Sequence, residues 1–236
     1  MAETHQQLIT QFAAVLASLH DMEAGPSRLC EAGRQMLDAD GAALSVITSA
    51  RTTVLLAATN ELATSLEDLQ EVVGEGPSKD AYLHSTVQTG NFAATDDPRW
   101  TLLYANTARV GFSGTVVAVP LRPAEEVIGT LTAYRNDDQL TVDATTAGFL
   151  SAALGTAILQ DPQSGLDADT YADVWSSRAQ IHQATGMIIS QVRVRPEDAL
   201  ALLRGQAFAS DTTLLHVAQE ILDRRIDFRH FTIKGD

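Results

Sequence analysis

Arginine and histidine side chains near the end of the chain have the chemistry to bind a polyanion. A guanidinium group contacts phosphate and releases counterions, and an imidazole ring stacks on unpaired bases or hydrogen-bonds with them. The candidate phosphate-binding residues are Arg178, Arg193, Arg195, Arg204, Arg224, Arg225 and Arg229, and the candidate base-binding residues are His182 and His216. On these residues alone, the alternative of a solvated helix surface with ordinary ion pairs stays open.

Charge is distributed unevenly along the chain, and this determines whether the chain can bind a polyanion. The formal net charge is -14, which by itself argues against a nucleic-acid partner because a basic surface attracts a polyanion. Residues 1–170, however, contain 8 basic and 22 acidic side chains, whereas residues 171–236 contain 8 of each. The last part of the chain is therefore neutral and can present a local basic face.

Three helices are expected to position these side chains. Apolar residues recur at helical spacing over residues 170–191. A second helix begins at Pro196, with acidic residues in its first turn, and a third follows Ser210 and Asp211. Because no strand pattern remains after residue 169, the sequence predicts an all-α three-helix bundle over residues 170–231.

Three blocks of this bundle resemble the ANTAR family, the RNA-binding module of bacterial antitermination regulators. The blocks are residues 178–188 (RAQIHQATGMI), 196–204 (PEDALALLR) and 214–218 (LLHVA). The first block fits the usual family pattern Arg-x-x-Ile-x-x-Ala-Lys-Gly at Arg178, Ile181, Ala184 and Gly186. The resemblance implies a module that binds structured RNA of the tandem-hairpin type and prevents transcription termination.

Two positions depart from the family pattern. Thr185 stands where a lysine is common, and Asp211, Thr212 and Thr213 stand where an asparagine and basic residues usually precede the third block. The resemblance still places Thr185 and Thr213 on the RNA-binding face, beside the arginines and histidines named above. Since both departures remove positive charge, the alternative is a degenerate regulator that acts by protein–protein interaction or small-ligand binding, without RNA affinity.

The earlier part of the chain has the pattern of an α+β domain. Helices are expected at residues 8–19, 27–37, 61–73, 79–83, 98–108 and 142–159, and strands at residues 42–48, 53–58, 87–94, 114–121 and 127–134. Short loops join the strands as hairpins, so the sheet is expected to be antiparallel. Two glycines and a proline within residues 74–77 break the chain between two of the helices.

This part of the chain resembles a GAF domain, the sensory fold of many bacterial regulators, over residues 25–160. The similar segments are residues 39–45, 69–70, 74–78, 119–121 and 128–134. The resemblance implies a small-ligand pocket between the sheet and its covering loops. The candidate pocket residues are Gly76, Ser78, Tyr82, Phe92, Trp100, Tyr104 and Phe112. The alternative is that these aromatic residues form core, and the sequence identifies no cofactor.

The first and last helices of this part carry long apolar stripes. Residues 1–24 are expected to form an N-terminal helix, and residues 161–169 a linker to the bundle. The two helices either pair with their copies in a homodimer or cover only their own sheet.

Enzymatic and membrane functions are not expected. The sequence has no GxSxG, GxxxxGK[ST], HExxH or CxxC motif, so no catalytic residue and no metal ligand is assigned. Cys30 is the single cysteine, which excludes an internal disulfide. With no signal peptide and no apolar run approaching about 20 residues, a cytoplasmic protein is expected.

Overall fold

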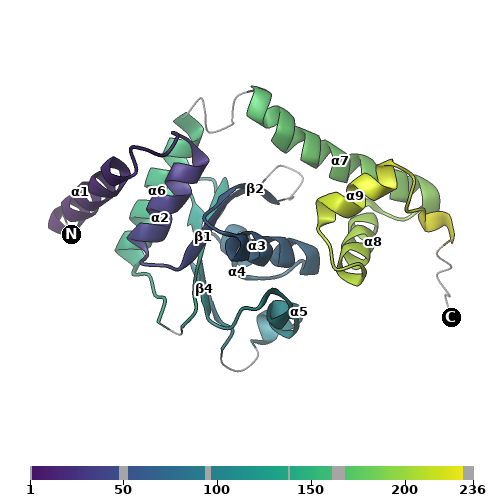
Figure 1. Cartoon of the computed structure of the whole chain (residues 1–236), viewed down its shortest axis with the longest axis horizontal. Helices are drawn as coiled ribbons and strands as arrows, with labels where there is room; N and C mark the ends of the chain where they lie inside the picture. The colour runs from purple at the N-terminus through teal and green to yellow at the C-terminus, as the bar shows by residue number, and fades with distance from the viewer. Residues whose placement is uncertain (1, 48–52, 94–96, 138, 161–167, 231–236) are drawn as a thin grey trace.

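The fold is built on a five-stranded antiparallel sheet (Figure 1). The computed structural model describes residues 2–47, 53–93, 97–137, 139–160 and 168–230, without the side chains of residues 2, 168–179, 197 and 230. The strand order is β2-β1-β5-β4-β3. The strands are β1 (Gly41–Ile47), β2 (Thr53–Ala58), β3 (Gln88–Asn91), β4 (Thr115–Leu121) and β5 (Gly129–Arg135). This confirms the predicted α+β domain with an antiparallel sheet.

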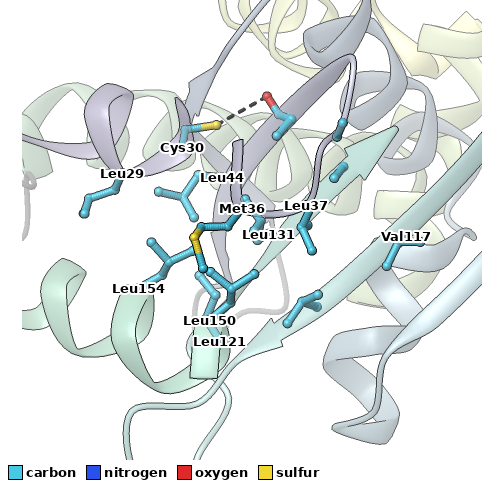
Figure 2. Packing of buried hydrophobic residues seen from close by; sticks show 14 of the residues in the cluster. Leu29, Cys30, Met36, Leu37, Leu44, Val117, Leu121, Leu131, Leu150 and Leu154 are labelled. Atoms are coloured by element: carbon cyan, nitrogen blue, oxygen red, sulfur yellow. Dashed lines mark hydrogen bonds between the residues drawn. The ribbon is translucent and has the colours of Figure 1, made fainter. Parts of the chain in front are cut away.

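One face of the sheet carries the larger apolar core. Alternate strand residues such as Leu44, Leu121 and Leu131 point to this face, as the period of two requires. They meet Leu29 of α2 (Pro26–Met36) and Leu154 of α6 (Ala144–Gln160), as Figure 2 shows. These two helices therefore form the layer that covers this face.

Helix α1 (Ala2–Ser18) packs on that helical layer rather than on the sheet. Its contacts are with α2 and α6, and its Phe12 ring lies edge-on to Phe149 of α6, with ring centroids 5.6 Å apart. The first and last helices of this domain thus contact each other within one chain.

The opposite face of the sheet packs against shorter helices. These are α3 (Glu61–Val73), α4 (Pro77–His84) and α5 (Thr101–Asn106), with the 3₁₀ turns η1 (Pro98–Trp100) and η2 (Thr107–Val110) on either side of α5. Residues adjacent to those of the first face, such as Ala43, Val116 and Tyr134, line this second core. The chain thus forms three layers, with the sheet in the middle.

The predicted single helix over residues 98–108 is interrupted in the structure. The Asp97 side chain accepts a hydrogen bond from Arg99 N, which caps a 3₁₀ turn instead of an α-helix. Trp100 then adopts a non-helical backbone (φ -136°, ψ 51°), with its ring fully buried and its indole N–H donating to Asp80 Oδ2 at 2.8 Å. The helix is interrupted at Trp100 because the backbone there adopts the conformation that buries this ring.

Three helices form the C-terminal bundle that the sequence predicts. They are α7 (Ala168–Val192), α8 (Pro196–Ala209) and α9 (Leu214–Leu222), followed by the 3₁₀ turn η3 (Phe228–His230). Ile188, Leu203 and Val217, one from each helix, are almost wholly buried in its core. Among the described residues, no helix is both long enough and apolar enough to cross a membrane.

Candidate functional site

The exposed side of α7 carries the first block of candidate RNA-binding residues. Ile181, Ala184 and Ile188 face the bundle core, whereas His182 and Gly186 are exposed. Ala184 is completely buried in the core of the bundle. Gly186 is different, because a Cβ atom built there would meet nothing within 4 Å. Helix packing therefore does not require a glycine at this position.

An exposed glycine inside a helix lowers stability by roughly 0.5–1 kcal/mol relative to alanine. Packing within the described part of the chain therefore does not account for the small size of Gly186. Thr185, the neighbouring candidate, donates a hydrogen bond from Oγ1 to the Ile181 carbonyl oxygen of its own helix at 2.7 Å.

The other candidate RNA-binding residues occupy different surroundings. Arg193 is exposed and adopts a left-handed backbone (φ 55°) just beyond α7. Arg195 precedes α8 and pairs with Asp198, Nε to Oδ2, at 3.1 Å. Thr213 is the N-cap of α9 and accepts a hydrogen bond from the backbone N–H of His216 at 3.1 Å. His216 is exposed, and the side chain of Arg178 lies outside the described residues.

Arg204 lies against the first domain, not on an open surface. Its Nη2 is 3.2 Å from Glu71 Oε1 of α3, and Lys79 Nζ of α4 is 3.6 Å from Glu71 Oε2. The Arg204 side chain is 24% exposed and that of Glu71 is 12% exposed. The structure thus separates Arg204 from the exposed side of α7. Sequence alone could not predict this ion pair, because its partners are 133 residues apart.

A groove in the bundle brings two further arginines together. It encloses about 290 Å³ and is lined by Met187, Ser190, Gln191, Arg224, Ile226, Asp227 and Arg229. The chain after α9 turns back onto α7 here, and Phe228 N donates to Gln191 Oε1 at 2.9 Å. Arg229 is paired with Asp227. Arg224 and Arg229 were already candidate phosphate-binding residues, and the structure brings them to one groove, which no pattern in the sequence indicates.

The candidate ligand-pocket residues of the first domain mostly form core. Phe92, Trp100 and Phe112 are buried in the cluster on the second face of the sheet. Tyr104 packs on Phe92, with ring centroids 4.3 Å apart, and its hydroxyl group donates to the Asn91 carbonyl oxygen at 2.9 Å. Tyr82 is half-buried. The aromatic candidates therefore stabilise this face of the domain by packing.

The glycine-rich break at residues 74–78 has a geometric reason. Gly74 ends α3 in a left-handed conformation (φ 81°), and Gly76 begins α4 at φ 142°, where a Cβ atom would lie 2.5 Å from Gln70 Oε1. Glycine alone fits both positions without strain. Between them, Glu75 Oε1 accepts a hydrogen bond from Leu103 N at 3.0 Å and so caps α5.

A buried polar cluster centred on Glu67 lies between α3 and the sheet. Glu67 Oε2 accepts hydrogen bonds from Ser45 Oγ at 3.3 Å and Ser78 Oγ at 3.2 Å, and Oε1 accepts one from Gln70 Nε2 at 3.2 Å. Burial raises the pKa of Glu67, while the two serine hydroxyl groups oppose the rise. Ser78, a predicted pocket residue, also lies 3.1 Å from Thr130 Oγ1. The predicted site therefore contains a buried carboxyl group that was not among its predicted residues.

A signal for this cluster was present in the sequence. Glu67 and Gln70 lie at the spacing of the buried Ala63 and Leu66, on the inner stripe of α3, where polar residues need hydrogen-bond partners. In the described part of the chain, no group of three or more His, Cys, Asp or Glu residues is arranged to hold a metal ion.

Comparison with known families identifies the bundle. The ANTAR domain model matches residues 174–222, which include most of α7 and all of α8 and α9. This confirms the resemblance found in the three sequence blocks. No curated protein sequence matches the chain.

Solved structures similar to the chain include GAF domains. The GAF domain of the Acinetobacter phosphoenolpyruvate-protein phosphotransferase is 11% identical, covers 64% of this chain and 92% of that chain, and has a TM-score of 0.42. The second GAF domain of DevS from Mycobacterium smegmatis is 15% identical, covers 75% of this chain and 99% of that chain, and has a TM-score of 0.33. Because these values are low, the fold class of the first domain rests on its own sheet and helices.

Proposed function

Because residues 174–222 form an ANTAR domain, we propose that the protein binds structured RNA and prevents transcription termination under control of its first domain. In this proposal, residues 170–231 are the RNA-binding module, residues 25–160 are the sensory domain, and residues 161–169 link them. The protein acts in the cytoplasm as a regulator and not as an enzyme. The observation that carries the proposal is the family match.

The exposed side of α7 supports a particular interface. His182, Thr185 and Gly186 lie close together in the first ANTAR block, and Gly186 leaves room for close approach of a phosphate backbone. Arg193, Arg224 and Arg229 supply positive charge on the same module, and phosphate contacts provide most of the non-specific affinity for nucleic acid. The RNA is therefore expected to contact α7 and the end of the bundle.

A gel-shift titration with a tandem-hairpin RNA at two salt concentrations tests this proposal. Gly186→Glu places a carboxylate and extra bulk on the exposed side of α7, where the fold has open space. We expect an affinity about ten-fold lower or more, with binding that weakens as salt rises. The control is Leu83→Glu, which adds the same charge at an exposed position of α4. If the two substitutions lowered RNA affinity equally, α7 would not be the RNA-binding interface.

A second function is favoured by the way the charges of the bundle are paired. Arg195, Arg225 and Arg229 each have an acidic partner within the bundle, so its surface is less basic than its arginine content suggests. A protein-interaction regulator without RNA affinity fits this observation. Salt-insensitive or absent RNA binding by the wild-type protein would favour this second function.

The proposed active form is a homodimer that pairs through α6 and α1. Helix α6 has no charged residue, and Leu159 on α6 is 53% exposed while Ile9 on α1 is 42% exposed. Two linked modules bind two RNA hairpins more tightly than one, because the second contact forms at high effective concentration. Leu159→Glu should shift the sedimentation of the protein to that of a monomer, whereas Leu83→Glu should not.

A small ligand of the sensory domain is also proposed, in the layer between the sheet and α3 and α4. The polar cluster of Glu67, Ser45 and Ser78 supplies hydrogen-bonding groups there. A thermal-shift screen with wild-type protein and Ser78→Ala tests this proposal, because a ligand of this layer would stabilise the wild type more.

A further inference from the structure

Helix α3 belongs to the cores of both domains. Ala63 and Leu66 face the sheet and lie in the core of the first domain. Val72, near the end of the same helix, is buried in the core cluster of the bundle together with Ile181, Leu203 and Val217. In Figure 1, α3 lies between the sheet and the bundle, and its bundle contacts are with α8 and α9. The two domains are therefore packed together through one helix.

Charged side chains flank this apolar contact. Arg204 of α8 pairs with Glu71 of α3. At a second point, Arg109 of η2 pairs with Asp211, and its guanidinium lies over the ring of Phe208, 5.1 Å from the ring centroid. Both contacts join an arginine to an acidic residue of the other domain. The contacts that hold the ANTAR module to the first domain thus include the buried Val72, two interdomain ion pairs and the cation–π contact of Arg109 with Phe208.

The Glu71–Arg204 pair has incomplete hydrogen bonding. In the described part of the chain, neither Glu71 Oε2 nor Arg204 Nε has a hydrogen-bond partner, and Lys79 Nζ at 3.6 Å is too far for an ordinary hydrogen bond. A largely buried pair with one hydrogen bond regains little of the free energy lost on desolvation. The contact can therefore open without the loss of a strongly stabilising interaction.

Charged side chains beside this pair are also desolvated. Asp68 lies one turn before Glu71, and burial, followed by the charge of Glu71, raises the pKa of Asp68. Burial also lowers the pKa of Lys79. The carboxylate of Glu71 thus lies among desolvated charges, and its partner Arg204 is itself a candidate phosphate-binding residue. A backbone phosphate of RNA would offer this guanidinium a solvated partner of the same charge, with two oxygen atoms for a bidentate contact.

We propose that the carboxylate of Glu71 binds Arg204 in the position that an RNA phosphate would occupy. Closure of the sensory domain onto the bundle and RNA binding through Arg204 therefore exclude each other. In the closed form, α3 covers this part of α8 and Glu71 holds the Arg204 guanidinium, so RNA contacts the exposed side of α7 without Arg204. In the open form, Arg204 is a further phosphate contact. Opening separates Val72 from the bundle core and releases Arg204. The inference rests on the proposed RNA function, whereas the closed contact does not.

The test uses the full-length chain and the tandem-hairpin RNA. Glu71→Gln removes the competing carboxylate, and we expect affinity to rise about five-fold or more. The matched control is Glu61→Gln, which makes the same charge change in the first turn of the same helix. Arg204→Gln should lower affinity in the open protein, and Glu71→Gln should add nothing in the Arg204→Gln background. An equal rise with Glu61→Gln, or a rise that persists without Arg204, overturns the proposal.

Opening is measured independently by small-angle X-ray scattering without RNA. Val72→Glu places a charge in the bundle core and should increase the radius of gyration of the chain, and Glu71→Gln should do so to a smaller extent. If the scattering shows that the bundle separates from the first domain but no variant binds RNA, the proposed RNA-binding function is wrong. If the bundle separates and all variants bind RNA equally, only the proposed competition between Glu71 and RNA is wrong.

Discussion

The guanidinium of Arg204 lies 3.2 Å from the carboxylate of Glu71, although the two residues are 133 positions apart in the sequence. One belongs to the ANTAR module and the other to the domain that precedes it. A residue expected to contact RNA phosphate thus has an internal anion as its partner. This ion pair joins the two domains. Substitution of either residue therefore measures how much the contact contributes to the stability of the protein.

Replacement of Glu71 by glutamine should destabilise the protein more than replacement of Arg204. Glu71→Gln leaves two largely buried cations, Arg204 and Lys79, without the carboxylate that they share. Arg204→Gln keeps the contact between Glu71 and Lys79. We expect a coupling energy of about 1–2 kcal/mol between the two positions. Urea unfolding of the wild type, both single variants and the double variant measures it, and strictly additive effects would show that the pair contributes nothing.

Alanine should stabilise the protein at position 186 and destabilise it at position 155. A Cβ atom at Gly186 meets open space, so only helix propensity changes, by about 0.5–1 kcal/mol in favour of alanine. At Gly155, the Cβ atom would lie 2.8 Å from Pro123 Cδ and 3.0 Å from Pro123 N. Thermal unfolding of both variants checks this contrast. A loss of stability in Gly186→Ala would reveal a packing role that the structure does not contain.

The buried carboxyl group of Glu67 should make stability fall as pH rises. Burial raises its pKa above the ordinary value of 4.5, so the native state binds this proton more tightly than the unfolded state does. Its contribution is most favourable below pH 4.5 and is lost as pH rises through the native pKa. Chemical unfolding of the wild type and Glu67→Gln across this range isolates the effect, because all other carboxyl groups are common to both proteins. Parallel curves would contradict the assignment.

The thiol of Cys30 should be unreactive in the native protein. Burial raises its pKa to about 12, and Sγ donates a hydrogen bond to the Ala42 carbonyl oxygen at 3.3 Å. Thiolate is the reactive species, so a colorimetric disulfide reagent at pH 8 should modify Cys30 only after unfolding. Cys30→Ser in denaturant provides the baseline, and rapid reaction of the native protein would mean that this core opens locally.

The local sequence pattern was sufficient to predict much of the fold. Helix α3 begins and ends at the predicted residues, Glu61 and Val73, because its cap, its apolar spacing and the glycine that ends it are neighbours in the sequence. The strand order along the chain and the helical C-terminal bundle were predicted for the same reason. The interrupted segment around Trp100 was not, because its backbone follows a hydrogen bond to Asp80, 20 residues away.

The sequence by itself determined the order of the elements, the three ANTAR blocks and the residue types available to bind phosphate. Only the tertiary structure decided where those residues lie. It buried Glu67 among hydroxyl groups, left Gly186 open on α7, and placed Arg204 against Glu71. Periodicity and caps depend on residues within a few positions of each other, whereas exposure and ion pairing depend on which surfaces meet after the chain has folded.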